Sequence, residues 1–219
     1  PAAAIVIPAW RNSQTIDLVL GALQGQLRSG DEVVIVESSA DGSAADLQQR
    51  WGWVRVLAQP RQTYPPAARE IGVAATSAPI IVFLDADAIP DPTWLDTLRK
   101  SLGTADAAGG SVQNGTPESL VGTASFFAEF MRWLPSARTP DSLINCNLLI
   151  RRTTFGEIGG FAAQVWPAED TLLTYPLMGS GRAIFVPEAT VIHLNRTSIR
   201  DVLRHQVILG RSFADVCRH

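Results

Sequence analysis

Two aspartates, Asp85 and Asp87, directly follow the near-continuous apolar run 79–84, where a metal ion could be bound. Side chains two residues apart on an extended chain point to the same side, so both carboxylates can reach one hard cation. Magnesium or manganese held in this way would neutralise a diphosphate. The alternative interpretation is an acidic turn without a ligand. The metal site is favoured because ligands of open α/β sheets bind beyond the carboxyl ends of the strands.

A second group of residues is suited to contact a nucleotide. Glu37 ends the apolar run 32–36 and can accept hydrogen bonds from a nucleobase or a ribose, as acids at nucleotide-binding strand ends do. Pro8 and Ala9 end an earlier apolar run and would form the neighbouring wall of such a pocket. Arg69 lies in a helical segment and could contact phosphate or base. The alternatives are a solvated turn for Glu37 and a surface salt bridge with an acidic residue for Arg69.

These side chains need a scaffold that places them together, and the first half of the chain predicts one. Strands are indicated by short β-branched and apolar runs, and helices by apolar residues at helical spacing. The predicted strands are 4–8, 32–37, 54–57 and 79–84, and the helices between them are 16–27, 44–51 and 66–76. This alternation is typical of a doubly wound α/β fold, in which apolar strands are covered on both faces.

The second half continues the pattern after a change in composition. Between 114 and 140 the chain carries several Gly and Pro residues around an aromatic helix at 126–130. The other predicted helices are 94–102, 153–158, one that begins at Glu169, and 198–216; the other predicted strands are 107–112, 145–150, 182–186 and 190–193. No linker separates two independent units, so a single α/β domain over 1–219 is predicted.

The composition excludes several classes of protein. The chain has 219 residues, 46% hydrophobic and 18% charged, so disorder is excluded and a sizeable core is expected. A formal net charge of −3 excludes a general nucleic-acid-binding surface. Cys146 and Cys217 form neither a disulfide framework nor a zinc motif, which is typical of reduced thiols in a cytoplasmic protein. No apolar run approaches the roughly 20 residues that cross a bilayer, and the first residues lack a signal-peptide pattern.

Several motifs follow one another along the chain in a specific order. The first half carries Ile5-Val6-Ile7-Pro8-Ala9, Val36-Glu37-Ser38-Ser39-Ala40-Asp41-Gly42, Ala68-Arg69-Glu70-Ile71-Gly72 and Phe83-Leu84-Asp85-Ala86-Asp87. The second half carries Gly159-Gly160-Phe161, Glu169-Asp170, the segment 181–189 and His193. Over roughly residues 4–212 this order resembles family 2 glycosyltransferases with the GT-A fold. The resemblance implies a Rossmann-like, mostly parallel central sheet flanked by helices. It also implies one compact domain, with a nucleotide-sugar-binding half at about 1–103 and an acceptor-binding half at about 104–219.

The resemblance implies an inverting glycosyltransferase that moves one sugar from a nucleoside diphosphate sugar to an acceptor hydroxyl. Asp85 and especially Asp87 would bind a divalent cation, Mn²⁺ or Mg²⁺, together with the donor diphosphate. Glu37 would contact the nucleoside. A UDP-sugar is the favoured donor, with GDP or TDP as alternatives, and the acceptor would be a glycan, a lipid or a small molecule.

In such enzymes an acidic pair near the acceptor contains the general base, which here means Glu169 or Asp170, and the second position is the usual one. An inverting displacement needs the acceptor hydroxyl to be deprotonated as it attacks the anomeric carbon. The alternative for the pair is stabilisation of a helix N-terminus, and both interpretations can hold together. His193, after the β-rich run 190–192, corresponds to a histidine that the family often uses as a further metal ligand. A polar surface residue is the alternative.

The remaining candidates concern the acceptor and a surface. Trp166 precedes the acidic pair and could stack on a sugar ring, or it could belong to the core. Arg204 and Arg211 lie on the last predicted helix and are acceptor-site candidates. That helix resembles a basic amphipathic surface helix, which either is solvated or lies on the inner face of an anionic membrane.

Motifs that are missing from the sequence narrow the choice of function. Processive polysaccharide synthases of the family carry Q-x-x-R-W, which does not occur, so single-sugar transfer is expected. The absence of G-x-S-x-G and of G-x-G-x-x-G argues against a serine hydrolase and a dehydrogenase. The segment 8–11 is not the glycine-rich, basic loop of a nucleotidyltransferase. The remaining alternative is a non-catalytic relative that binds sugar nucleotides or glycans, which would lack the metal acids or the base.

Overall fold

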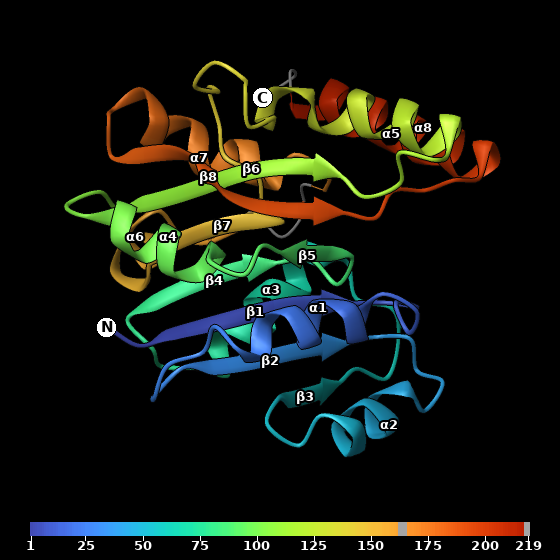
Figure 1. Cartoon of the computed structure of the whole chain (residues 1–219), viewed down its shortest axis with the longest axis horizontal. Helices are drawn as coiled ribbons and strands as arrows, with labels where there is room; N and C mark the ends of the chain where they lie inside the picture. The colour runs from blue at the N-terminus through green and yellow to red at the C-terminus, as the bar shows by residue number, and fades with distance from the viewer. Residues whose placement is uncertain (162–165, 217–219) are drawn as a thin grey trace.

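The computed structural model describes residues 1–161 and 166–216, and these residues form one eight-stranded sheet (Figure 1). The spatial order of the strands is β3-β2-β1-β4-β7-β6-β8-β5. Their bounds are Ala3–Ala9 for β1, Glu32–Glu37 for β2, Arg55–Ala58 for β3, Ile80–Leu84 for β4, Ala88–Pro90 for β5, Ala107–Asn114 for β6, Asn147–Arg151 for β7 and Ala183–His193 for β8.

Helices cover both faces of this sheet. Their bounds are Ile16–Gln24 for α1, Ser43–Arg50 for α2, Pro65–Ala74 for α3, Trp94–Leu102 for α4, Leu120–Phe130 for α5, Arg152–Glu157 for α6, Glu169–Gly179 for α7 and Ile199–Val216 for α8. A short 3₁₀ turn, Met131–Trp133, follows α5. Figure 1 shows α1 on the near face of the sheet and α3 on the far face.

The strand pairing confirms a mostly parallel sheet. Strands β3, β2, β1 and β4 are parallel neighbours, and β6 and β8 are also parallel. Strand β7 is antiparallel to both β4 and β6, and β5 is antiparallel to β8. The predicted α/β fold of alternating strands and helices is therefore correct, with β7 as an antiparallel insertion between its two parallel parts.

The core explains why β4 is apolar along its whole length. Val82 and Leu84 belong to the apolar cluster that includes the buried faces of α1 and α4. Ile81 and Phe83 belong to a second cluster, on the side of α6 and α7. Because successive side chains of a strand point to opposite faces, a strand covered on both faces needs apolar residues throughout.

The structure corrects one predicted element and adds another. The two strands predicted at 182–186 and 190–193 are one strand, β8, which pairs with β6 on both sides of a register shift after Gly110. Residues 187–189 form the irregularity, and a Cβ at position 110 would lie 1.8 Å from the Ala189 carbonyl oxygen, so only glycine fits there. Strand β5 has three residues, which is too short for a periodic signal in the sequence.

The structure also bears on the expectations for the cysteines and for membrane-spanning segments. Cys146 is a free, buried thiol, and burial raises its pKa well above the usual value, so it stays protonated and unreactive. Cys217 lies outside the described residues. None of the helices in the described ranges combines the length and the apolar character that crossing a membrane requires.

Candidate active site

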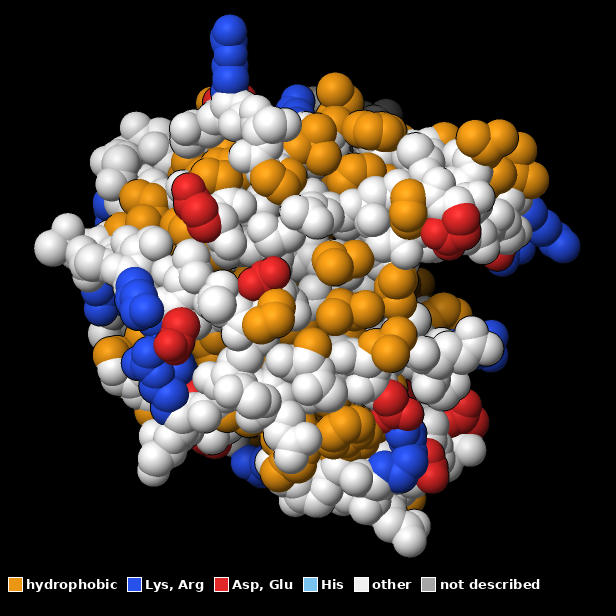
Figure 2. Space-filling view, viewed as in Figure 1, with side chains coloured by type: hydrophobic (Ala, Val, Ile, Leu, Met, Phe, Trp, Pro, Cys, Tyr) orange, Lys and Arg blue, Asp and Glu red, His pale blue; other side chains and the backbone are white. Residues whose placement is uncertain are grey.

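The carboxyl ends of β1, β2 and β4 meet at one edge of the sheet because these strands are parallel. Ala9 and Glu37 lie opposite each other at the ends of β1 and β2, and Asp85 and Asp87 follow the end of β4. Figure 2 shows the surface hollowed on the side toward which these strands point, below the lobe that carries α5 and α8. The edge that the sequence predicted for ligand binding is therefore an open depression.

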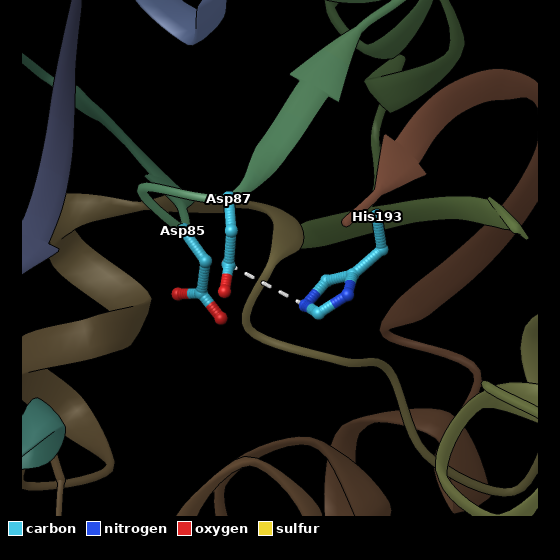
Figure 3. Close-up of side chains that lie close together, drawn as sticks. All are labelled: Asp85, Asp87 and His193. Carbon is cyan, nitrogen blue, oxygen red and sulfur yellow. Dashed lines mark ion pairs between the residues drawn. The ribbon is translucent and has the colours of Figure 1, made fainter. Parts of the chain in front are cut away.

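Asp85, Asp87 and His193 form a cluster at this edge (Figure 3). Each offers one ligand atom, and the three atoms lie within 4.8 Å of one another. His193 reaches the cluster because β5 pairs with the end of β8, where Ala88 lies opposite His193. The imidazole Nε2 lies 3.5 Å from Asp87 Oδ1. His193 is only 6% exposed, so it is not a polar surface residue.

The charges of this cluster fit a cation. Burial raises the pKa of Asp87 and the neighbouring Asp85 carboxylate raises it further, whereas His193 and Arg196 act in the opposite direction. Two carboxylates crowded together are stabilised by a divalent cation, and carboxylate oxygens with an imidazole are ligands that Mn²⁺ accepts. The donor set thus suits the predicted ion.

Arg69 connects this cluster to the second acidic pair. Its Nη2 donates to Asp85 Oδ1 at 2.6 Å and its Nη1 donates to Glu169 Oε1 at 2.8 Å. Arg69 is brought here by the close packing of α3 on β1: a Cβ at Gly72 would lie 2.3 Å from Val6 Cγ1. Although burial acts to lower it, the two carboxylates hold the pKa of Arg69 above its usual value. Arg69 therefore forms a buried pair of salt bridges and not the surface salt bridge of the alternative interpretation.

Glu169 and Asp170 begin α7 and differ in their surroundings. Glu169 is buried and accepts from Arg69 and from Asn145 Nδ2, the latter at 3.1 Å. Asp170 accepts the Thr171 backbone N–H at 2.7 Å. Burial, and then the Glu169 carboxylate, raise the pKa of Asp170 to about 7. Both acids lie in the first turn of the helix, where negative charge is favourable. The two acids thus differ, since Glu169 is engaged in a salt bridge and Asp170 has a raised pKa.

A separate pocket lies at the ends of β1 and β2. It is lined by Ala9, Arg11, Asn12, Ser13, Ile16, Glu37, Ser39, Asp41, Ser43, Asp46, Leu47 and Arg50. Glu37 is buried rather than solvated, and its Oε1 accepts from the Ser39 backbone N–H at 3.0 Å and from the Ser39 hydroxyl. Pro8 is partly buried one residue before Ala9. Both Glu37 and Ala9 therefore line one concave surface, whereas Pro8 is not among its lining residues.

The acceptor candidates lie on two parts of the chain, Trp166 before α7 and the two arginines on α8. The ring centroids of Trp166 and Tyr64 are 5.1 Å apart, and Tyr64 is 57% exposed, so the pair is a surface feature rather than part of the core. Arg204 and Arg211 are exposed on α8. Within the described residues, neither arginine has an ion pair with an acid of the site.

The structure also shows four residues that sequence reasoning did not place in the site, namely Asn195, Arg196, Glu129 and His205. Asn195 accepts a hydrogen bond from His193 Nδ1 over 3.1 Å. Arg196 Nη1 lies 3.5 Å from Glu129 Oε2, and His205 Nε2 of α8 lies 3.3 Å from the same oxygen. Burial acts to raise the pKa of Glu129, but His205 and Arg196 hold it below its usual value. The proximity of Asn195 and Arg196 to His193 in the sequence was the only available signal.

Comparison with known proteins shows the family of this chain. The family model described as Glycosyl transferase family 2 matches residues 4–162, and the chain belongs to this family. The chain is 28% identical over 232 residues to Pre-mycofactocin glycosyltransferase of Mycobacterium tuberculosis, across 98% of this chain and 47% of that protein. It is 26% identical over 174 residues to Glycosyltransferase AglE of Haloferax volcanii, across 74% of this chain and 56% of that protein. The chain thus spans about half the length of these relatives.

Solved structures confirm the GT-A fold. Mannosyltransferase PcManGT from Pyrobaculum calidifontis, in complex with GDP-Man and Mn²⁺, superposes with a TM-score of 0.76 at 20% identity, over 99% of this chain and 64% of that one. GalNAc-T7 with UDP, GalNAc and Mn²⁺ gives 0.69 at 15% identity, over 90% and 44% of the two chains. S. aureus TarS 1-349 in complex with UDP-GlcNAc gives 0.68 at 14% identity, over 90% and 60%.

Proposed function

We propose that this chain transfers one sugar from a nucleoside diphosphate sugar to an acceptor hydroxyl, with inversion at the anomeric carbon and without processivity. The observation that carries the proposal is the cluster of Asp85, Asp87 and His193, which Arg69 links to the acids at the start of α7. Membership of glycosyl transferase family 2 supports it.

The first half of the chain, about residues 1–103, would bind the donor together with His193. Asp85, Asp87 and His193 would hold Mn²⁺ or Mg²⁺, and the bound ion would offset the charge of the donor diphosphate. The pocket that contains Ala9 and Glu37 would take the nucleoside. The Mn²⁺ complexes of PcManGT and GalNAc-T7 support the metal, and the nucleotides of the solved relatives, GDP-Man and UDP, support this class of donor.

Asp170 would be the general base. Glu169 already accepts from Arg69 and Asn145, so it is less able to take a proton than Asp170. A base with a pKa near 7 has a large deprotonated fraction at neutral pH and still has a strong affinity for the proton. Asp170 would deprotonate the acceptor hydroxyl as that oxygen attacks the sugar, and the proton would remain on the carboxyl group.

Residues of about 104–219 would bind the acceptor, which would be a glycan, a lipid or a small molecule. Trp166 and Tyr64 present aromatic rings next to α7, and such rings stack well on sugars. Arg204 and Arg211 would contact an acceptor that carries negative charge.

The outer side of α8 would contact the anionic surface of a membrane. Ile199, Leu203 and Val207 recur every four residues and are 66%, 61% and 53% exposed. The exposed Arg200 and Arg204 repeat this spacing one residue later, so a basic row lies beside the apolar row. Apolar and basic rows on one helix side are suited to the boundary between headgroups and acyl chains.

Nucleotide binding by the variant Asp87→Asn tests the proposal. We expect calorimetric titrations of the wild-type chain with UDP, GDP and TDP to show one nucleotide that binds more tightly with Mn²⁺ than with a chelator. Asp87→Asn should lose this gain and keep the affinity measured in chelator, because the substitution removes the charge and not the pocket. Asp91→Asn, an exposed acid directly after β5, is the matched control and should bind like the wild type. Equal affinities of Asp87→Asn and wild type at saturating Mn²⁺ would show that the metal assignment is wrong.

A further inference from the structure

Asn195 is a buried residue whose side chain contacts the imidazole of His193. Asn195 Oδ1 lies 3.1 Å from His193 Nδ1, on the far side of the ring from Asp87. We propose that Asn195 is a positioning residue that fixes the tautomer of His193, so that Nε2 presents a lone pair to the cation. The inference rests on the proposed function, in which His193 is a metal ligand.

The orientation of the Asn195 amide follows from its other contacts. Its second terminal atom lies 3.0 Å from the His193 carbonyl oxygen and 2.9 Å from Asn114 Oδ1. A main-chain carbonyl only accepts hydrogen bonds, so the atom that faces it must be the NH₂ group. The oxygen of Asn195 is therefore the atom that faces His193 Nδ1.

Asn114 is fixed in the same way, so the two amides cannot flip together. The Thr116 backbone N–H donates to Asn114 Oδ1 at 2.9 Å, and a main-chain N–H only donates. On its other side, Asn114 Nδ2 donates to the Thr123 hydroxyl at 3.0 Å. The chain of hydrogen bonds thus ends on main-chain groups of fixed polarity, which assigns each amide without reference to the imidazole.

An acceptor oxygen at Nδ1 requires a proton on that nitrogen, and in the neutral ring Nε2 then carries the lone pair. The nitrogen of a metal-bound histidine must be free of a proton, and the partner of its other nitrogen commonly fixes this arrangement. Phe130 stacks on the imidazole with ring centroids 4.4 Å apart, which restrains the ring plane. Figure 3 shows the imidazole turned toward Asp87. The site is therefore prepared for a cation before one arrives.

A purely structural role is the competing explanation, because Asn195 also joins the ends of β6 and β8 through Asn114 and Thr116. The tautomer itself separates the two explanations. The chain has three histidines, so a two-bond ¹H–¹⁵N spectrum of the metal-free protein contains few imidazole signals. The signals of His193 are those that disappear in His193→Gln. At about pH 8 we expect Nδ1–H in the wild type and Nε2–H in Asn195→Ala, where Asp87 becomes the stronger acceptor.

Two further variants complete this measurement. Asn195→Asp keeps an acceptor oxygen at Nδ1, so it should retain the Nδ1–H form even if Asn195→Ala folds poorly. Its second oxygen loses the donor contacts to the His193 carbonyl and Asn114, so this variant tests the acceptor alone. Thr123→Ala removes only the outer end of the hydrogen-bond chain and should match the wild type. An Nε2–H or doubly protonated ring in the wild type, or an unchanged tautomer in Asn195→Ala, would overturn the inference.

Metal affinity distinguishes failure of the inference from failure of the proposed function. In Mn²⁺ titrations followed by electron paramagnetic resonance, Asn195→Ala should bind the ion about 10–100-fold more weakly than the wild type, and Asn195→Asp should bind it more tightly than Asn195→Ala. If His193→Ala weakens binding and Asn195→Ala does not, the metal site stands and the role of Asn195 is wrong. If His193→Ala has no effect, the metal site of the proposed function is wrong.

Discussion

Arg69 is the residue through which the two acidic pairs of the site are joined. One guanidinium serves Asp85 and Glu169, which are separated by more than eighty positions in the chain. The side chain of Arg69 is 4% exposed and that of Glu169 is 6% exposed. Water therefore solvates neither charge if the ion pair is broken. Arg69 is therefore both a structural tie and the main source of positive charge beside Asp170.

Removing Arg69 should destabilise the fold strongly. Arg69→Met leaves a buried carboxylate without its partner, which typically costs about 3–5 kcal/mol in the free energy of unfolding. Urea denaturation of the wild type and the variant measures this difference. Arg28→Met is the matched control, because the Arg28–Asp96 pair is on the surface and should contribute less than about 1 kcal/mol. Equal losses in the two variants would contradict the structural role of Arg69.

Asp170 should govern the pH dependence of catalysis. The rate of sugar transfer should rise with pH through about 7, where this carboxyl loses its proton. Asp170→Asn should lower turnover by about 10²–10⁴-fold and abolish the pH dependence. Turnover at saturating donor, measured across this range, is the test. A Glu169→Gln variant with a collapsed rate beside a near-normal Asp170→Asn would transfer the role to Glu169.

The same substitution should make the protein more stable above neutral pH. Because the folded pKa of Asp170 lies above its ordinary value of 3.8, the ionised carboxylate opposes folding, and this penalty grows as the pH rises from about 4 to 7. Asp170→Asn should therefore raise the free energy of unfolding at pH 8, by at most about 4 kcal/mol, and change it little near pH 4. A loss of stability at pH 8 would contradict the raised pKa.

At the scale of elements, α3 is positioned by the absence of a side chain at Gly72. A Cβ there would meet Val6 of β1 at 2.3 Å and Val36 of β2 at 3.4 Å. This contact sets the distance between α3 and the sheet, and therefore the place of Arg69 one turn earlier on the helix.

Gly72→Ala should destabilise the fold by about 1–3 kcal/mol, because the added methyl group overpacks the contact between helix and sheet. Gly21→Ala in α1 is the control, since a Cβ there meets nothing within 4 Å. An exposed helical glycine replaced by alanine should gain up to about 1 kcal/mol. Thermal melts of the two variants should therefore shift in opposite directions, and shifts of the same sign would contradict the packing argument.

Most elements and the acids of the site could be predicted from the sequence, because both depend on local patterns. The runs 32–37 and 94–102 match β2 and α4 residue for residue. Strand β8 was split in two because Pro187 and the irregularity beside it interrupt the apolar pattern. The pairing of Arg69 and the role of Asn195 depend on how distant segments pack, which spacing along the chain does not contain.

At the scale of the whole molecule, the apolar and basic rows of α8 predict binding to anionic lipid. Co-sedimentation should show more protein on vesicles with phosphatidylglycerol than on phosphatidylcholine alone, and the difference should shrink at high salt. Leu203→Gln should weaken binding, whereas Leu18→Gln, an exposed apolar residue of α1, should not. Equal recovery on both kinds of vesicle, or no binding at all, would leave α8 as a solvated helix.

The pairing of β5 with β8 has a consequence for how the protein is made. Ala88 lies opposite His193, so this contact closes a loop of about a hundred residues, which is slow to form because of its entropic cost. A chain that leaves the ribosome from its N-terminus presents Asp85 and Asp87 long before His193 is synthesised. The three-residue site therefore does not exist in partially synthesised chains. Binding of a metal ion by all three residues would show that β8 has paired with β5.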